Sequence, residues 1–236
     1  MSGHSKWSNI QHRKGAQDRK RAKLFTKFGR ELTRAAKEDG GDPDFNPRLR
    51  LAIEKAKAGN MPKDILERAI KKGTGELEGV EYMEIRYEGY GPAGTAFIVD
   101  VVTDNKNRSA SEVRMVFTRK GGNLGTDGAV AWMFKKEGVI TVKAEGLDPD
   151  EFMMAALEAG AEDVSLEDDV FEVITNYTEF QSVLENLKNA GYTYEEAEIE
   201  MNAENRMEIT DLDTAKKVMA LYEALEDLDD VQEVYG

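Results

Sequence analysis

The apolar periodicity of this chain changes at Gly75, and this change divides the chain into two kinds of structure. Before Gly75, apolar residues recur at helical spacing in three segments. Asn46 followed by Pro47 is a typical helix start, because asparagine caps the first turn and proline is well tolerated at the first helical position. Glycines follow the segments, as they do at many helix ends. The sequence therefore predicts a three-helix domain over residues 18–75, with helices at 18–38, 46–59 and 62–73.

Beyond Gly75, alternating strand patterns are interrupted by single helices. Residues 82–88 and 95–103 predict two strands, and a helix around Val113 and Phe117 follows them. Two strands and one helix make only half of a sheet domain. The C-terminal helix and a short strand at residues 231–235 would complete it.

We therefore expect a discontinuous α+β middle domain built from residues 76–128 and 206–236. Between its parts, residues 129–205 contain enough strand and helix patterns for an α+β domain of their own. Its expected strands lie near residues 129–134, 139–142, 163–166, 171–175 and 195–201, and its expected helices near residues 150–159 and 177–190. The predicted fold class is α+β, with one helical domain and two ferredoxin-like α+β domains.

The composition argues against several classes of function. The 236 residues include no cysteine, and the two histidines are His4 and His12, which disfavours thiolate chemistry and Cys- or His-ligated metals. No apolar run approaches the roughly 18–20 residues of a membrane span, and the start lacks the apolar region of a signal peptide. No carboxylate pair stands out as a general acid and base. We expect a cytoplasmic, non-enzymatic protein without metal or cofactor, without a membrane or small-molecule partner, and monomeric.

Charge is distributed unevenly along the chain. Residues 1–75 hold 19 Lys and Arg against 9 Asp and Glu, a net charge of +10. Residues 76–236 hold 13 against 37, a net charge of −24. A basic end on an acidic body is typical of a protein that presents one face to a polyanion, although acidic surfaces also aid solubility.

One face of the first predicted helix is a stripe of cations. At about 100° per residue these side chains share a direction opposite to the apolar stripe. Like charges at this spacing repel by a few tenths of a kcal/mol, which a bound polyanion would offset. We interpret the stripe as a nucleic-acid-binding face; a solvated face and an acidic protein partner are the alternatives. The stripe, called the basic rail below, comprises Lys23, Lys27, Arg30, Arg34 and Lys37.

Residues 1–17 show no apolar periodicity, and we expect a flexible basic tail. A tryptophan in such a segment can stack on an unpaired base for roughly 1–3 kcal/mol, or it can fold back onto the helical domain. Basic residues around it would contact phosphates, which fixes position but not sequence. The candidate contact residues here and just after the tail are His4, Lys6, Trp7, His12, Arg13, Lys14, Arg19, Lys20 and Arg21.

Two glycine motifs lack the context of a nucleotide site. The segment 89–94 matches GxGxxG, but a strand follows where a helix should begin, so a hairpin turn is predicted. The loop 121–128 has no Lys-Ser/Thr pair of a P-loop, and it reads as a hinge or as a surface approached closely by a partner. A possible partner surface is formed by Arg108, Gly121, Gly122, Asn123 and Gly125.

Several long segments resemble one family. The opening MSGHSKWSNIQHRK, the run NPRLRLAIEKAKAGNMPKDILERAIKKGTGE and the short motifs YEGYGPAG, TDNKNR and GGNLGTDG are similar to the YebC/PmpR family. Gly15 and Ala93 depart from its usual residues without removing a charge or an aromatic ring. Members are described as probable transcriptional regulators, and they include a mitochondrial translational activator of cytochrome oxidase.

The resemblance implies three domains, with the C-terminus completing the middle one, and a cytoplasmic protein without cofactor. It implies a DNA-binding transcriptional regulator; the alternative is a translation factor that binds structured RNA or the ribosome. The residues do not decide between DNA and RNA. The segment 63–72 is the candidate for a recognition helix, and base-specific readout is not evident from it.

Overall fold

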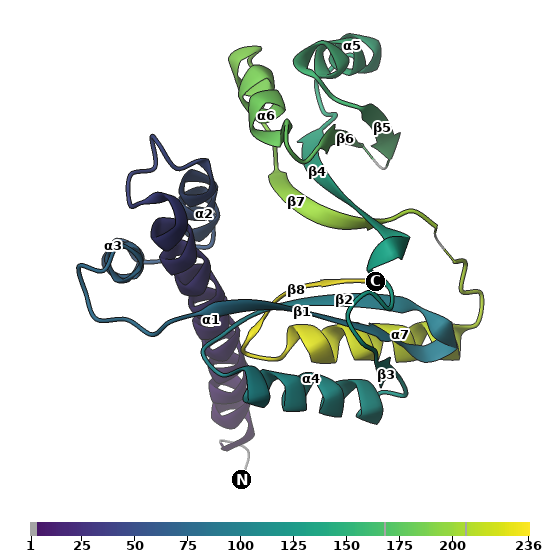
Figure 1. Ribbon diagram of the computed structural model, residues 1–236. Helices are drawn as coiled ribbons and strands as arrows, with labels where there is room; N and C mark the ends of the chain where they lie inside the picture. Colours follow the sequence, from purple (N-terminus) through teal and green to yellow (C-terminus); the bar gives the residue numbers. More distant parts are fainter. Residues whose placement is uncertain (1–3, 168, 206) are drawn as a thin grey trace.

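The computed structural model describes residues 4–167, 169–205 and 207–236, with side chains from Arg21 onward (Figure 1). Three helices open the chain: α1 (His4–Asp39), α2 (Pro47–Ala58) and α3 (Lys63–Gly73). Their apolar faces meet in one core that includes Leu32, Leu49 and Leu66. The three-helix prediction for this region is confirmed.

Asn46 connects the end of α1 to the start of α2. Its side-chain oxygen accepts the Leu49 backbone N–H at 2.9 Å, as an N-cap does. Its Nδ2 donates to the carbonyl oxygens of Ala35 and Gly40, each at 2.8 Å. Because Asn46 is fully buried, these bonds satisfy polar groups at two helix ends at once.

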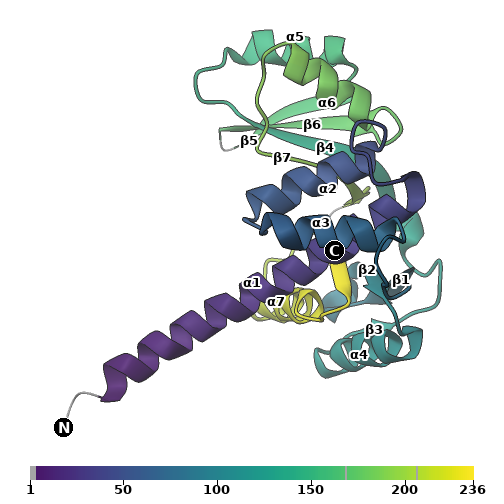
Figure 2. The ribbon, with the colours of Figure 1, turned by 90° about the vertical axis from the view of Figure 1, so that its left-hand side faces the viewer.

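The first helix is longer than the sequence predicts. It begins at His4, so residues expected to form a flexible tail continue α1. This segment contains no proline, and Gln11, Arg13, Lys14, Ala16 and Gln17 near its end have good helix propensity, so the backbone can be helical. Its lack of apolar periodicity matches its position, because the N-terminal half of α1 projects away from the body of the protein (Figure 2).

The middle domain is a four-stranded sheet with strand order β3-β1-β2-β8. The first part of the chain supplies β1 (Met83–Tyr90), η1 (Pro92–Gly94), β2 (Ala96–Thr103), α4 (Lys106–Arg119) and β3 (Asn123–Leu124). The C-terminus supplies α7 (Leu212–Glu226) and β8 (Val231–Tyr235), and β8 pairs antiparallel with β2. Helices α4 and α7 share a core with the sheet, in which Phe97, Phe117 and Leu221 are almost completely buried.

The inserted domain has strand order β5-β6-β4-β7, with α5 and α6 packed against one face of the sheet. Its elements are η2 (Ala131–Met133), β4 (Phe134–Lys143), α5 (Pro149–Ala159), β5 (Asp163–Glu167), β6 (Val170–Asn176), α6 (Phe180–Asn189) and β7 (Glu196–Ala203). The predicted α+β class with a discontinuous middle domain is confirmed.

The prediction of a strand at residues 129–134 is wrong. The chain turns there into η2, and β4 begins only at Phe134. The reason is Glu88, whose buried carboxylate accepts the backbone N–H groups of Gly128, Val130 and Ala131 at 2.7–2.8 Å. These donors curve around one carboxylate, so they cannot form a strand ladder. The hairpin predicted at residues 89–94 is confirmed, since β1 and β2 pair in antiparallel register around it.

Candidate nucleic-acid interface

The basic rail lies on α1, but it does not face open solvent along its length. It runs past the connection between α7 and β8, a segment rich in Asp and Glu. Lys23 Nζ lies 3.3 Å from an Asp227 carboxylate oxygen, and Lys27 Nζ donates to the Gln232 carbonyl oxygen at 3.2 Å. Burial lowers the pKa of Lys27, although the charges of Glu233 and Glu226 oppose this shift. The first part of the rail therefore contacts the middle domain.

Arg30 reaches into a buried polar cluster around Asp230. Its Nη2 donates to Asp230 Oδ1 at 2.9 Å, and its Nη1 donates to the Asp229 carbonyl oxygen. Asp230 is 2% exposed and also accepts hydrogen bonds from Ser109 Oγ at 2.6 Å, Thr103 Oγ1 at 2.9 Å and Arg108 Nη2 at 2.8 Å. Burial alone would raise the pKa of Asp230, but these hydrogen bonds and the Arg30 charge hold it below the usual range. The cluster joins α1, α4 and the C-terminal segment.

The other end of the rail is also paired. Arg34 Nη2 donates to Glu38 at 2.9 Å and Arg34 Nη1 contacts Glu84, while Lys37 Nζ donates to Glu81 at 2.8 Å. Carboxylates of the same chain therefore offset the charge at this end of the rail as well. The physical reason is tertiary: chain segments distant in sequence bring carboxylates onto α1. A polyanion would have to displace them to bind here.

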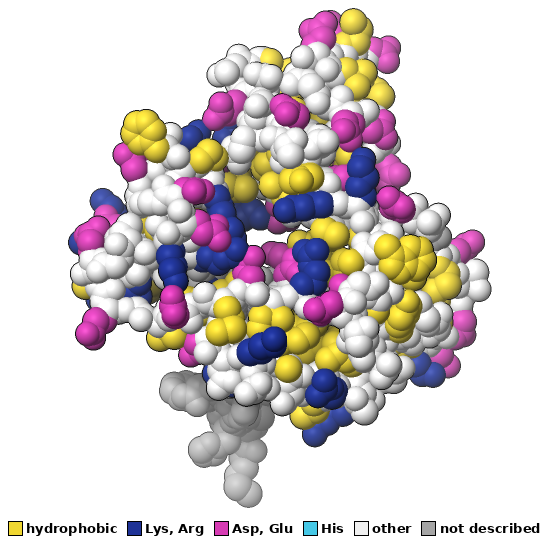
Figure 3. All heavy atoms as spheres, in the orientation of Figure 1, with side chains coloured by type: hydrophobic (Ala, Val, Ile, Leu, Met, Phe, Trp, Pro, Cys, Tyr) yellow, Lys and Arg dark blue, Asp and Glu magenta, His cyan; other side chains and the backbone are white. Residues whose placement is uncertain are grey.

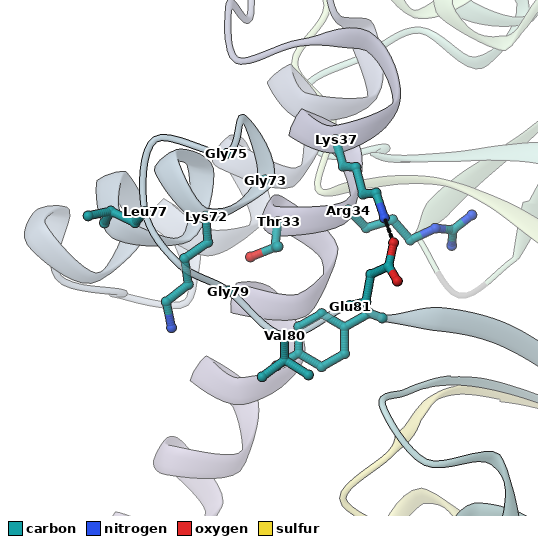
Figure 4. Close-up of a pocket in the computed structure, with 11 residues that line it drawn as sticks. Thr33, Arg34, Lys37, Lys72, Gly73, Gly75, Leu77, Gly79, Val80 and Glu81 are labelled. Carbon is teal, nitrogen blue, oxygen red and sulfur yellow. Dashed lines mark hydrogen bonds and ion pairs between the residues drawn. The ribbon is translucent and has the colours of Figure 1, made fainter.

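A pocket of about 250 Å³ lies between α1, α3 and the segment that leads into β1 (Figure 4). Its lining includes cations from two helices, Arg34, Lys37 and Lys72, as well as Glu81. Figure 4 shows Lys37 directed toward Glu81, with the ion pair closing one side of the pocket. Side chains of both signs line it, so the pocket does not select an anion by charge alone.

The cations that precede the rail are on the projecting half of α1. The backbone of residues 4–20 is helical, and their side chains lie outside the described ones. This holds for His4, Lys6, Trp7, His12, Arg13, Lys14, Arg19 and Lys20, so the proposed stacking of Trp7 stays a prediction. Arg21 is exposed, and its guanidinium lies 5.3 Å from the centre of the Phe25 ring.

The residues of the candidate partner surface around the glycine loop form contacts within the middle domain. Arg108 pairs with Asp104 and Asp230, and these hydrogen bonds raise its pKa further above its ordinary value. Gly122 and Asn123 are close to β1, and Gly125 N–H donates to the Glu88 carbonyl oxygen at 2.8 Å. Gly121 has a φ of +79°, which favours glycine, and an added Cβ would meet no neighbour. The loop is thus anchored on the sheet, with Gly121 turned toward open space.

Sequence reasoning missed an exposed tryptophan beside this loop. Trp132 is 69% exposed, and its Nε1–H donates to the Ala129 carbonyl oxygen at 3.1 Å, which holds the ring in place. A tryptophan directly after a glycine-rich segment was the available signal.

The helix α3, which was the candidate recognition helix, contributes one face to the core of the helical domain. Its Leu66 and Ala69 pack against α1 and are buried there.

A hollow lies between the three domains, with side chains of both charges around it (Figure 3). One ion pair that joins two domains is formed by Lys55 of α2 and Glu198 of β7. The side chain of Glu233 on β8 is exposed, but the protein around it reduces its hydration. This loss of hydration and the charge of Glu198 raise the pKa of Glu233 to about 7, against the opposing charges of Lys55 and Lys27.

The described residues contain neither a helix that could span a membrane nor a cluster of metal ligands. No described helix has the length and apolar character needed to span a bilayer. Groups of three or more His, Asp or Glu side chains arranged to hold a metal ion do not occur within the described ranges.

Comparison with known proteins gives one consistent match. Residues 5–76 match the family model "TACO1/YebC protein N-terminal domain", and residues 82–236 match "TACO1/YebC second and third domain". A probable transcriptional regulatory protein of Fusobacterium nucleatum is 83% identical over 236 residues, covering 100% of this chain and 95% of the relative. One from Halothermothrix orenii is 53% identical, covering 100% of this chain and 94% of the relative.

A solved structure agrees with these matches. The crystal structure of a conserved hypothetical protein from Aquifex aeolicus superimposes with a TM-score of 0.83 at 48% sequence identity. It covers 91% of this chain and 88% of the other. The two family models together match almost the whole chain, and the three-domain architecture is shared. The chain belongs to the TACO1/YebC family.

Proposed function

We propose that this protein is a non-enzymatic regulator of gene expression that binds nucleic acid through the N-terminal half of α1. The names of its relatives, probable transcriptional regulatory proteins, support the role of regulator. The placement on α1 is our own inference from charge and geometry.

The supporting observation is the division of α1 into two halves. Lys23, Arg30 and Lys37 already contact acidic groups or carbonyl oxygens of the body. Residues 1–21 hold six Lys and Arg against one Asp, a net charge of +5, and most of them lie on a helix that projects outward (Figure 2). A cationic helix that projects from the body is accessible to a phosphate backbone.

This arrangement favours binding to the sugar-phosphate backbone. Lys and Arg contacts to phosphate set position and affinity, while sequence is read at base edges. The acidic body, with a net charge of −24 over residues 76–236, repels nucleic acid and restricts the approach to the basic end. Regulation of particular genes then requires either a base contact on α1 or a partner that supplies specificity.

Binding can be measured by fluorescence anisotropy with labelled duplex DNA and labelled single-stranded RNA across a salt series. The variant Arg13→Gln/Lys14→Gln/Arg19→Gln should lose affinity and lower the slope of log affinity against log salt by about 2–3 on DNA. The control Lys136→Gln/Lys143→Gln/Lys188→Gln removes the same charge from the inserted domain. Equal losses in both variants would contradict the placement on α1.

Crosslinking in cells, followed by sequencing of the bound nucleic acid, identifies the ligand. Recovery of promoter DNA would support the transcriptional role that the names of the relatives indicate. Recovery of ribosomal RNA would contradict that role and favour a translation factor.

A further inference from the structure

Helix α4 concentrates positive charge in an otherwise acidic part of the chain. Residues 106–120 hold five Lys and Arg against one Glu. The other 146 residues of the segment 76–236 hold eight against 36. The helix therefore differs sharply in charge from the domain to which it belongs.

Most of these cations are exposed and have no internal counter-charge. Lys106, Arg114, Arg119 and Lys120 are all exposed, and the described part of the chain forms no ion pair with any of them. Arg108 differs, because it pairs with Asp230 and Asp104. The contrast with the basic rail is direct: the rail is neutralised within the protein, and these four side chains are not.

The structure of α4 itself accounts for only some of these charges. The helix dipole stabilises cations in the last turn of a helix. This effect explains Arg119 and the adjoining Lys120. The same dipole disfavours Lys106 in the first turn, where α4 has no acidic residue. Arg114 lies too far from either end for a dipole effect. Stability of the helix thus does not explain Lys106 or Arg114.

The place of α4 in the fold keeps these charges away from the inserted domain. Helix α4 forms an outer layer of the middle domain, and both views put it at the end of the molecule remote from the inserted domain (Figures 1 and 2). The projecting half of α1 also points away from the inserted domain, but it leaves the body on the side opposite to α4 (Figure 2). Two separate helices that are remote from α5 and α6 are therefore basic, one on each side of the body.

We propose that the exposed cations of α4 form a second contact surface for the sugar-phosphate backbone of the nucleic acid. This inference rests on the function proposed above and extends it from one helix to two. From Lys106 to Lys120 the helix spans about 21 Å at 1.5 Å per residue, a length that meets several successive phosphates. Two helices that contact the same backbone fix the orientation of the body on the nucleic acid, which contacts on α1 alone would leave free.

The test uses the full chain with Lys106→Gln, Arg114→Gln and Arg119→Gln combined. Affinity for labelled duplex DNA and labelled single-stranded RNA of mixed sequence is measured between about 50 and 200 mM salt. Each lost phosphate contact lowers the log–log slope by about 0.9 on duplex DNA and about 0.7 on a single strand. For the α4 variant we expect this log–log slope to be smaller in magnitude than that of the wild type by about 2–3. The control Lys136→Gln/Lys143→Gln/Lys188→Gln should keep the wild-type slope, and circular dichroism should show the same melting temperature for the α4 variant and the wild type.

The outcomes separate this inference from the proposed function. A wild-type slope in the α4 variant, together with a reduced slope in Arg13→Gln/Lys14→Gln/Arg19→Gln, would overturn the α4 surface and leave the function on α1 intact; α4 would then suit an acidic protein. A reduced slope in the α4 variant alone would support α4 and contradict the placement on α1. No binding by the wild-type protein would overturn both.

Discussion

Arg30 Nη2 donates to Asp230 Oδ1 at 2.9 Å, joining two residues that lie 200 positions apart in the sequence. The carboxylate is 3% exposed at its side chain and the guanidinium 11%, so the pair is almost completely removed from water. Loss of one member of such a pair leaves an uncompensated buried charge, which is far more costly than the loss of an exposed pair. The Arg30–Asp230 contact therefore fixes α1 on the middle domain.

The first prediction concerns this contact. Asp230→Ala should lower the free energy of unfolding by about 3–5 kcal/mol, because Arg30 and Arg108 both lose a buried partner. Chemical denaturation measures the change. The matched control is Asp227→Ala, whose carboxylate is exposed and pairs with Lys23; it should cost less than about 1 kcal/mol. Similar losses at both positions would show that the buried cluster has no special role.

Acid should destabilise the protein through Asp230 and Glu88. Hydrogen bonds hold the pKa of each below its ordinary value despite burial, which acts in the opposite direction. A lowered folded pKa stabilises the fold above the unfolded pKa, and this stabilisation disappears as the pH falls through the folded value. Urea unfolding between neutral and strongly acidic pH should show this loss. Glu88→Gln should flatten the profile, and the exposed Glu145→Gln should not.

Glu233 should produce the opposite pH dependence. Because reduced hydration and the charge of Glu198 raise its pKa to about 7, its contribution to stability is complete below the ordinary carboxyl pKa and is lost as the pH rises through about 7. Relative to wild type, Glu233→Gln should therefore gain stability between mildly acidic and mildly alkaline pH. Thermal melts of both proteins across this range test the prediction. A constant difference in melting temperature would contradict it, and Glu158→Gln on α5 is the exposed control.

The C-terminal segment should be required for the middle domain. Leu221 of α7 is fully buried, so Leu221→Ala should lower the free energy of unfolding by about 2–5 kcal/mol through lost contacts and a cavity. Leu212→Ala, at a side chain that is 67% exposed, should change it by no more than about 0.5 kcal/mol. Deletion of residues 206–236 should prevent cooperative unfolding of the sheet, because β2 loses β8. An unchanged melting curve after the deletion would refute this dependence.

Trp7 and Trp132 offer a comparison between two tryptophans. If Trp7 stacks on an unpaired base, Trp7→Ala should weaken binding to single-stranded RNA by about 1–3 kcal/mol without changing the melting temperature. Trp132→Ala removes an exposed ring at the glycine loop, on a different domain, and should leave affinity unchanged. A lower melting temperature with unaltered affinity would instead show that Trp7 packs on the protein.

The sequence by itself determined the local elements of this protein. The Asn46-Pro47 start of α2 and the glycine turn between β1 and β2 depend on backbone preferences of adjacent residues, so a linear pattern predicts them. The incomplete strand–strand–helix segment even indicated that the C-terminus completes the middle sheet. The uneven charge was equally visible, because it requires only counting.

Tertiary structure alone decided which charges remain available. The basic rail has a clear periodicity in the sequence, but Asp227, Asp230 and Glu84 reach it only after the chain folds back on α1. Glu88 likewise turns residues 128–131 away from a strand through hydrogen bonds that cross about 40 positions. Periodicity describes which side chains share a face of one element. It contains no information about the distant group that packs there, and electrostatic pairing depends on that group because the interaction energy depends on distance and burial.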